Sequence, residues 1–319
     1  MDVKAAIRQV KPDLKDSSLK NYVSQLKILA GRATGSREFT NLKWLDDHKA
    51  LMKIVDEMSP HTKRNYLNSI VVIMQTRKGF DKNAAWVEYS KERDSINSHF
   101  AKEGGKHKKT DRQDKNWIDK EQFQTVLDWY SDFLVRRKVF KTDTSRIDEE
   151  EFKKLQEYVI LRLLQKHPSR NDFATVEVIS PTAYRALTPE VRRKNNYLVT
   201  KRDDIHFMLH QWKTKKDPTE VRRITLEKPL QKLLRAYLRK IGNRDHLFVD
   251  SRGSGLSRNS LTKLLVRVFK RHFPGKNVST TLLRHVFLSE KYGDVLEEME
   301  KDQVNLGHSA EMQKQYIKK

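Results

Sequence analysis

The residues near the end of the chain have types and spacing that suit covalent chemistry at a phosphate. Leu306-Gly307-His308-Ser309 is followed, eight positions after the histidine, by Tyr316, and Arg284-His285 lies upstream. A tyrosine becomes a nucleophile when a basic group helps to remove its proton. Arginine clamps a phosphate through two oxygens and never loses its charge. This ending therefore outlines a nucleophile that faces a phosphate.

Breaking a nucleic-acid strand without a metal has three requirements. A nucleophile attacks phosphorus, cations stabilise the oxygens on which charge builds, and an acid protonates the departing sugar oxygen. The chain offers Arg170 after His167-Pro168, Lys213 within Trp212-Lys213-Thr214, and Arg284. Lysine is the acid candidate because arginine keeps its proton.

The order of these residues resembles that of the tyrosine recombinase (phage-integrase) family over nearly the whole chain. The resembling residues are Arg170, Lys213, Leu283-Arg284-His285, Leu306-Gly307-His308-Ser309 and Tyr316. The helical N-terminal part resembles that family's core-binding domain. The resemblance implies a mobile element or a virus as the source, and chemistry that needs neither cofactor nor metal.

The resemblance also implies a role for each residue. Tyr316 attacks the scissile phosphate, which forms a 3′-phosphotyrosyl link and frees a 5′-hydroxyl. Arg170 and Arg284 clamp the phosphate, and Lys213 protonates the leaving 5′-oxygen. His308 hydrogen-bonds a non-bridging oxygen or helps to deprotonate the tyrosine.

Some positions differ from the family's pattern. Thr281 stands where the family usually has a histidine, so a neutral hydrogen bond or His285 takes over that role. Phe173 stands where an acidic residue is usual, so Asp172 or Glu177 is expected to orient the first arginine. The interval between the last histidine and the tyrosine is one residue shorter than is common.

Charge and composition define the class of partner. Lys and Arg total 65 against 42 Asp and Glu, a net charge of +23 that favours an anionic polymer such as double-stranded DNA. Without cysteine there are no disulfides, thiolate zinc sites or cysteine nucleophiles. No apolar run is long enough to span a bilayer, and no apolar leader opens the chain. We expect an intracellular protein that works wherever its DNA resides.

Hydrophobic periodicity predicts a mainly α fold with a small antiparallel β-sheet. Residues 1–103 read as a helical core-binding, DNA-binding domain, 104–116 as a basic linker and 117–319 as a catalytic domain. Alternation between Asn196 and Leu226 predicts short strands. Helices are expected elsewhere in the catalytic domain, at about 119–130, 149–166, 229–241, 257–273, 280–292 and 296–306.

Basic side chains outside the proposed site are candidates for contact with DNA. They are Lys63 and Arg64 after Pro60, Lys106, Lys108 and Lys109 in the linker, and Lys215 and Lys216 beside Lys213. The linker lysines either cross a nucleic-acid backbone as the two domains close around it or form a solvated tether.

Weaker candidates have structural explanations. Tyr292 is a rival nucleophile. His206 and His210 have a spacing that places them on one face of a strand, with no third ligand for a metal. Gly253-Ser254-Gly255 lacks the Gly-Lys-Ser/Thr ending of a phosphate loop and indicates a turn.

These inferences predict a site-specific DNA recombinase that closes around duplex DNA. We expect a monomer when free and a homotetramer on paired DNA sites, because recombination joins two duplexes. A type IB topoisomerase, which relaxes supercoils by the same chemistry, is the closest alternative. A DNA-binding relative without catalysis is the second.

Overall fold

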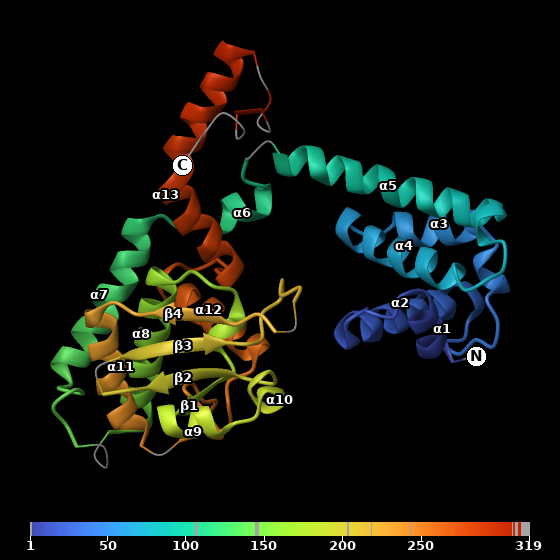
Figure 1. Cartoon of the computed structure of the whole chain (residues 1–319). Helices are drawn as coiled ribbons and strands as arrows, with labels where there is room; N and C mark the ends of the chain where they lie inside the picture. The colour runs from blue at the N-terminus through green and yellow to red at the C-terminus, as the bar shows by residue number, and fades with distance from the viewer. Residues whose placement is uncertain are drawn as a thin grey trace. The chain divides into compact units, whose positions relative to one another are not determined.

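The computed structural model describes residues 2–105, 108–143, 147–202, 204–217, 219–242, 244–307, 309 and 312–313. The chain divides into two compact units, Met1–Lys108 (unit 1) and Lys109–Lys319 (unit 2) (Figure 1). The division falls inside the segment that the sequence indicates as a linker. Helix occupies both ends of that segment, since α5 reaches Gly105 and α6 covers Asp111–Asn116.

Helix α6 follows from a capping box that the sequence analysis overlooked. The Thr110 hydroxyl accepts from the Gln113 N–H at 3.2 Å, and the Gln113 side-chain oxygen accepts from the Thr110 N–H at 2.8 Å. Two otherwise unpaired donors at the helix start are thereby satisfied. The abundance of charge in this segment therefore did not prevent regular structure.

Unit 1 is helical throughout its regular structure. Its elements are α1 (Val3–Val10), α2 (Asp16–Thr34), η1 (Lys43–Leu45), α3 (His48–Asp56), α4 (Pro60–Met74), η2 (Phe80–Lys82) and α5 (Ala84–Gly105). Helix α4 begins at Pro60 after the capping residue Ser59, as the sequence predicts. Its residues Leu67, Ile70 and Ile73 are fully buried and form the centre of the unit's core.

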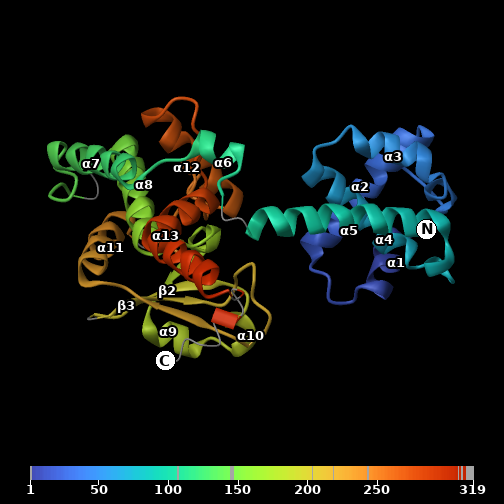
Figure 2. The same cartoon turned by 90° about the horizontal axis from the view of Figure 1, so that it is seen from above.

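Unit 2 combines helices with one sheet. Its helical elements are α6, α7 (Lys120–Arg136), α8 (Glu149–Lys166), η4 (Asn171–Phe173), α9 (Pro181–Ala186), α10 (Pro189–Arg192), α11 (Lys228–Ile241), α12 (Arg258–His272) and α13 (Thr280–Leu306). Helices α8, α11 and α12 lie behind the sheet in Figure 1 and to one side of it in Figure 2. Buried residues of these helices and of the sheet form a single core.

The sheet is mixed, with the order β1 (Val176–Ile179), β2 (Asn196–Thr200), β3 (Ile205–Leu209) and β4 (Arg222–Thr225). The antiparallel pairing expected between Asn196 and Leu226 is confirmed for β2, β3 and β4. Strand β1, which the sequence analysis did not predict, pairs parallel to β2. A parallel neighbour needs a crossover connection, and α9 and α10 provide it.

Helix α13 is one continuous helix of 27 residues where the periodicity predicts two. Gly293 lies within it, but a glycine costs a helix only about 1 kcal/mol and keeps its backbone hydrogen bonds. The helix ends at Gly307, which has the left-handed φ of 64°. Its C-terminal half extends beyond the other helices of unit 2 (Figure 1).

Candidate active site

The structure brings Arg170, Lys213 and Arg284 to one cleft of unit 2, with a volume of about 320 Å³. Segments that are far apart in the sequence meet here. The lining residues are Lys166, His167, Pro168, Ser169, Arg170, Asp172, Trp212, Lys213, Thr214, Arg222, Ile224 and Arg284. Three candidates that residue type, order and local context indicate in the sequence therefore line the same cleft.

The end of α8 places Arg170. The helix closes at His167, whose N–H donates to the Leu163 carbonyl at 2.8 Å, and Pro168 prevents a further turn. The chain then runs through Arg170 into η4. Burial lowers the pKa of the His167 imidazole, so this ring at the cleft wall favours its neutral form.

The loop between β3 and β4 places Lys213. Trp212 is only 7% exposed and anchors the loop against the core. The Lys215 ammonium donates to the His210 carbonyl at 2.8 Å and lies 5.1 Å from the Trp212 ring centroid. Lys213 and Lys216 are exposed on the same loop. The indole and its neighbouring cation therefore hold the turn that presents Lys213.

The first turns of α13 place Arg284. The Ser279 hydroxyl caps the helix by accepting from the Leu282 N–H at 3.3 Å. Leu283 and Val286 are buried, so Arg284 lies at the edge of the core and lines the cleft. Thr281 and His285, the residues predicted to support it, are exposed and are not among the described residues that line the cleft.

Asp172 is the carboxylate of the cleft, and it is only 6% exposed. Burial raises the pKa of its carboxyl, while the guanidinium groups of Arg258, Arg222, Arg170 and Arg284 act to lower it. Asp172 is therefore the one of the two acidic residues proposed to orient Arg170 that lies in the same cleft as this arginine.

Glu177, the other proposed acidic residue, lies on β1. Its side-chain oxygen accepts from the Asn195 amide at 2.7 Å, and it is not among the described residues that line the cleft.

Arg222 is a cleft residue that the sequence analysis missed. It begins β4, it is exposed, and its guanidinium lies 5.7 Å from the Trp212 ring centroid. The pair Arg222-Arg223 directly before an apolar strand residue was the available signal. Among the described residues, the cleft is lined by five Lys or Arg side chains and one carboxylate. This excess of cations suits a phosphodiester.

Tyr316, His308 and Lys106 lie outside the described residues. The rival nucleophile Tyr292 is on α13, 51% exposed, and is not among the described residues of the cleft wall. Gln313 lies against α13, where its amide donates to the Met299 carbonyl at 3.2 Å.

The predicted DNA contacts of unit 1 and the linker differ in their surroundings. Lys63 forms ion pairs with Asp56, at 2.7 Å, and with Glu92, and its side chain is 14% exposed. The Arg64 guanidinium lies 5.2 Å from the Phe100 ring centroid. Lys108 and Lys109 are exposed, and the Lys109 ammonium lies 4.3 Å from the Trp117 ring centroid.

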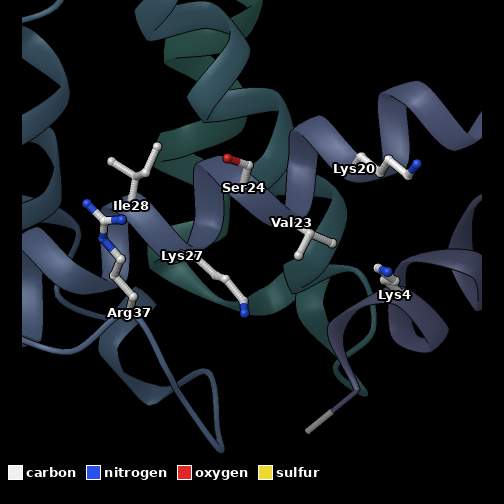
Figure 3. A pocket seen from close by; sticks show the side chains of 7 residues that line it. All are labelled: Lys4, Lys20, Val23, Ser24, Lys27, Ile28 and Arg37. Carbon is white, nitrogen blue, oxygen red and sulfur yellow. The ribbon is translucent and has the colours of Figure 1, made fainter.

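A second group of basic residues in unit 1 was not predicted. They line a groove of about 350 Å³, which we call the α2 groove. Its residues are the basic Lys4, Lys20, Lys27 and Arg37 together with Val23, Ser24 and Ile28. Figure 3 shows Lys20 and Lys27 on α2, Lys4 on α1 and Arg37 from the segment after α2. No acidic residue lines the groove within the described chain. Lys20 and Lys27 are seven residues apart, which places them on one face of a helix, two turns apart. This spacing is the sequence signal that indicates a basic face on α2.

The two histidines with metal-like spacing have protein partners. His206 Nδ1 lies 2.9 Å from an Asp204 oxygen, and His210 Nε2 lies 2.9 Å from the Tyr184 hydroxyl. The described residues contain no group of three or more His, Cys, Asp or Glu side chains that could hold a metal ion. None of the helices in the described ranges is both long and apolar enough to cross a membrane.

Comparison with known proteins finds distant structural likeness only. No family model matches the chain, and no curated protein does. A solved structure that resembles it is that of the XerH site-specific recombinase bound to palindromic difH substrate, a post-cleavage complex. The sequence identity is 14%, the alignment covers 92% of this chain and 73% of that chain, and the TM-score is 0.45. The function is therefore inferred from the residues of this chain.

Proposed function

We propose that the protein is a site-specific DNA recombinase of the tyrosine type, which cleaves and rejoins DNA strands through a 3′-phosphotyrosyl intermediate. The observation that carries this proposal is the convergence of Arg170, Lys213 and Arg284 on one cationic cleft. Two arginines can stabilise the charged oxygens of a phosphate and a lysine can act as the acid, which meets two of the three requirements of a metal-free phosphoryl transfer.

The cleavage step forms one bond to phosphorus, breaks another and transfers protons, and each of these changes involves a named group. The Tyr316 oxygen forms a bond to phosphorus as the bond from phosphorus to the 5′-oxygen breaks. His308 takes up the tyrosine proton, or solvent takes it up while His308 hydrogen-bonds a non-bridging oxygen, and Lys213 gives a proton to the departing 5′-oxygen. Arg170 and Arg284 balance the charge on the non-bridging oxygens. Rejoining reverses these steps with a 5′-hydroxyl as the nucleophile, so no nucleotide is hydrolysed.

Duplex DNA is the proposed partner, and its backbone is contacted outside the cleft as well. The α2 groove is the strongest candidate in unit 1, because its four cations have no carboxylate partner among the described residues (Figure 3). Lys63 is a weaker candidate, since two carboxylates already pair with it. The remaining proposed backbone contacts are Arg64, Lys106, Lys108, Lys109, Lys215 and Lys216.

Strand exchange between two duplexes implies a homotetramer on paired sites and a monomer in the absence of DNA. Leu288 and Val295 support assembly, because they lie seven residues apart on α13 and are 44% and 52% exposed. This proposed assembly distinguishes the recombinase from a topoisomerase that works as a monomer. The proposed location is inside the cell, where the target DNA resides.

A covalent trap tests this function. The protein is incubated with a pool of nicked duplexes of randomised sequence, denatured in SDS and examined for DNA that stays attached. We expect adducts with the wild-type protein and with Tyr292→Phe, and none with Tyr316→Phe. Absence of wild-type adducts, or adducts that survive Tyr316→Phe, would contradict the proposal.

The sequences recovered from the adducts define a substrate for the next comparison. Joining of two differently labelled duplexes is the result expected of a recombinase. Relaxation of a supercoiled plasmid without joining would instead identify a topoisomerase.

A further inference from the structure

The side chain of Asn196 connects the two chain segments that carry Arg170 and Lys213. Asn196 is the first residue of β2 and is 1% exposed. Its Oδ1 accepts hydrogen bonds from the His210 N–H at 2.8 Å and the Gln211 N–H at 2.7 Å. Its Nδ2 donates to the Gln211 carbonyl at 2.9 Å and to the Asp172 carbonyl at 3.1 Å. These four bonds use both donors and both acceptor positions of the carboxamide.

The position of Asn196 in the sheet explains why a side chain is needed there. It stands opposite Leu209, the last residue of β3, so the backbone ladder ends at this pair. The next two N–H groups, at His210 and Gln211, bond to the Asn196 side chain instead. The chain therefore leaves the sheet in a fixed direction, and Lys213 follows two residues after Gln211.

The same carboxamide fixes the other side of the cleft. The Asp172 carbonyl that accepts from Nδ2 lies two residues after Arg170. Arg258 reinforces this junction, since its guanidinium donates to the Gln211 carbonyl at 3.1 Å and lies 4.0 Å from an Asp172 oxygen. The two segments are thus joined through a buried polar group that has no unpaired donor or acceptor.

We propose that Asn196 is a positioning residue that sets Lys213 relative to Arg170, so that both side chains reach one phosphate. The identification of that phosphate as the scissile group rests on the proposed function. Binding of inorganic phosphate to the cleft can be tested whether or not the protein cleaves DNA. A neutral carboxamide suits the role because a buried charge at this point carries a large desolvation cost.

Asn196→Asp tests the role with a small change of shape. The variant keeps the acceptor oxygen but replaces the amide donor by a second oxygen, which then faces the carbonyls of Gln211 and Asp172. Asn195→Asp is the matched control. The Asn195 amide also donates to an oxygen, that of Glu177 at 2.7 Å, but it joins no segment of the cleft. Both variants lose an amide donor and gain a carboxyl group next to an oxygen.

The first measurement uses inorganic phosphate as the probe. Acetic anhydride acetylates exposed lysines, and mass spectrometry of the peptide that contains Lys213 reports how far phosphate protects it. We expect half-protection of Lys213 in the wild-type protein and Asn195→Asp at similar phosphate concentrations. In Asn196→Asp we expect half-protection to need roughly ten times more phosphate, because the displaced Lys213 ammonium no longer binds the same phosphate ion as Arg170. Equal protection in the two aspartate variants, or none in the wild-type protein, would overturn the proposal.

Folding is checked by thermal melting, with circular dichroism as the signal. If Asn196→Asp does not fold, Asn196→Ala, which removes the same bonds without an added carboxyl group, takes its place in the protection assay. If neither variant folds while Asn195→Asp does, Asn196 is required for the fold itself and the proposal of a positioning role is wrong.

The second measurement uses a duplex recovered from the covalent trap and varies its leaving group. With a 5′-bridging oxygen, we expect Asn196→Asp to form adducts on the order of 100-fold more slowly than Asn195→Asp, with a DNA Kd within about threefold. With a 5′-bridging sulfur, most of the rate returns, because this leaving group needs no proton from Lys213. Equal losses with oxygen and sulfur would contradict the role. A wild-type protein that forms no adduct refutes the proposed function and leaves the phosphate assay to decide the role of Asn196.

Discussion

The hydroxyl of Thr280 donates a hydrogen bond of 2.7 Å to the side-chain oxygen of Asn171, which ties the start of α13 to the residue after Arg170. Asn171 also donates through Nδ2 to the Thr262 hydroxyl on α12, at 2.8 Å. Thr280 is four residues before Arg284 on the same helix. One partly buried hydrogen bond therefore relates the positions of the two arginines of the cleft.

Replacing Thr280 with valine should reduce stability. Thr280→Val keeps the size of the side chain but leaves the Asn171 oxygen without its partner, at a cost of about 1–3 kcal/mol in the free energy of unfolding. Thr281→Val changes the exposed neighbour and should stay within about 0.5 kcal/mol. Urea unfolding measures both values. A larger loss for Thr281→Val than for Thr280→Val would contradict this assignment.

Arg222 should contact the DNA backbone, because it lines the cleft with the other cations. For Arg222→Ala we expect weaker binding of duplex DNA and a plot of log K against log salt that is shallower by about 1. Arg223→Ala is the control, since the Arg223 guanidinium pairs with Asp204 at 2.7 Å. Fluorescence anisotropy over a salt series gives both slopes. The prediction fails if the two variants change the slope equally.

The α2 groove should supply most of the backbone contacts of unit 1. Lys20→Gln and Lys27→Gln are each expected to reduce the salt slope by about 1, and the double variant by about 2. Lys63→Gln should lose less DNA affinity and more stability, because it leaves Asp56 and Glu92 without their cation. Anisotropy and urea unfolding of these four variants separate the effects. A Lys63→Gln protein with the largest loss of affinity would place the contact on α4 instead.

The ionisation of Asp172 should oppose folding. Burial raises the pKa of its carboxyl above the ordinary 3.8, so the folded protein holds this proton more tightly than the unfolded chain. The contribution of this group to stability therefore falls as pH rises through the window above 3.8. The difference in unfolding free energy, Asp172→Asn minus wild type, should increase with pH across that window and then level off. A difference that falls with pH would show that the surrounding arginines outweigh burial.

The sequence predicted the cationic residues of the cleft better than the residues that hold them. Arg170, Lys213 and Arg284 stand out by type and order, and the structure places all three at one cleft. Asn171, Asn196 and Thr280 are common polar residues, and Asn171 and Thr280 are 109 positions apart. Periodicity does not reveal such long-range pairs, because it reports only local structure.

The secondary structure shows the same limit. Local signals such as Ser59-Pro60 and the alternation in β2 and β3 predicted their elements correctly. Strand β1 is short, and its first residue, Val176, pairs with Asn196, which lies 20 positions later in the sequence. No local pattern specifies such a pairing. The break predicted within α13 is wrong because Gly293 keeps a helical backbone, which costs only about 1 kcal/mol and leaves the helix hydrogen bonds intact.

The most direct test of the central claim is identification of the residue that becomes attached to DNA. Adducts from the nicked-duplex pool are digested with nuclease and protease, and the peptide that carries the nucleotide is sequenced by mass spectrometry. The proposed function predicts a phosphodiester between the Tyr316 oxygen and a DNA 3′ end, with a free 5′-hydroxyl on the other side of the break. Attachment at another residue, at a 5′ end, or at no residue would contradict it.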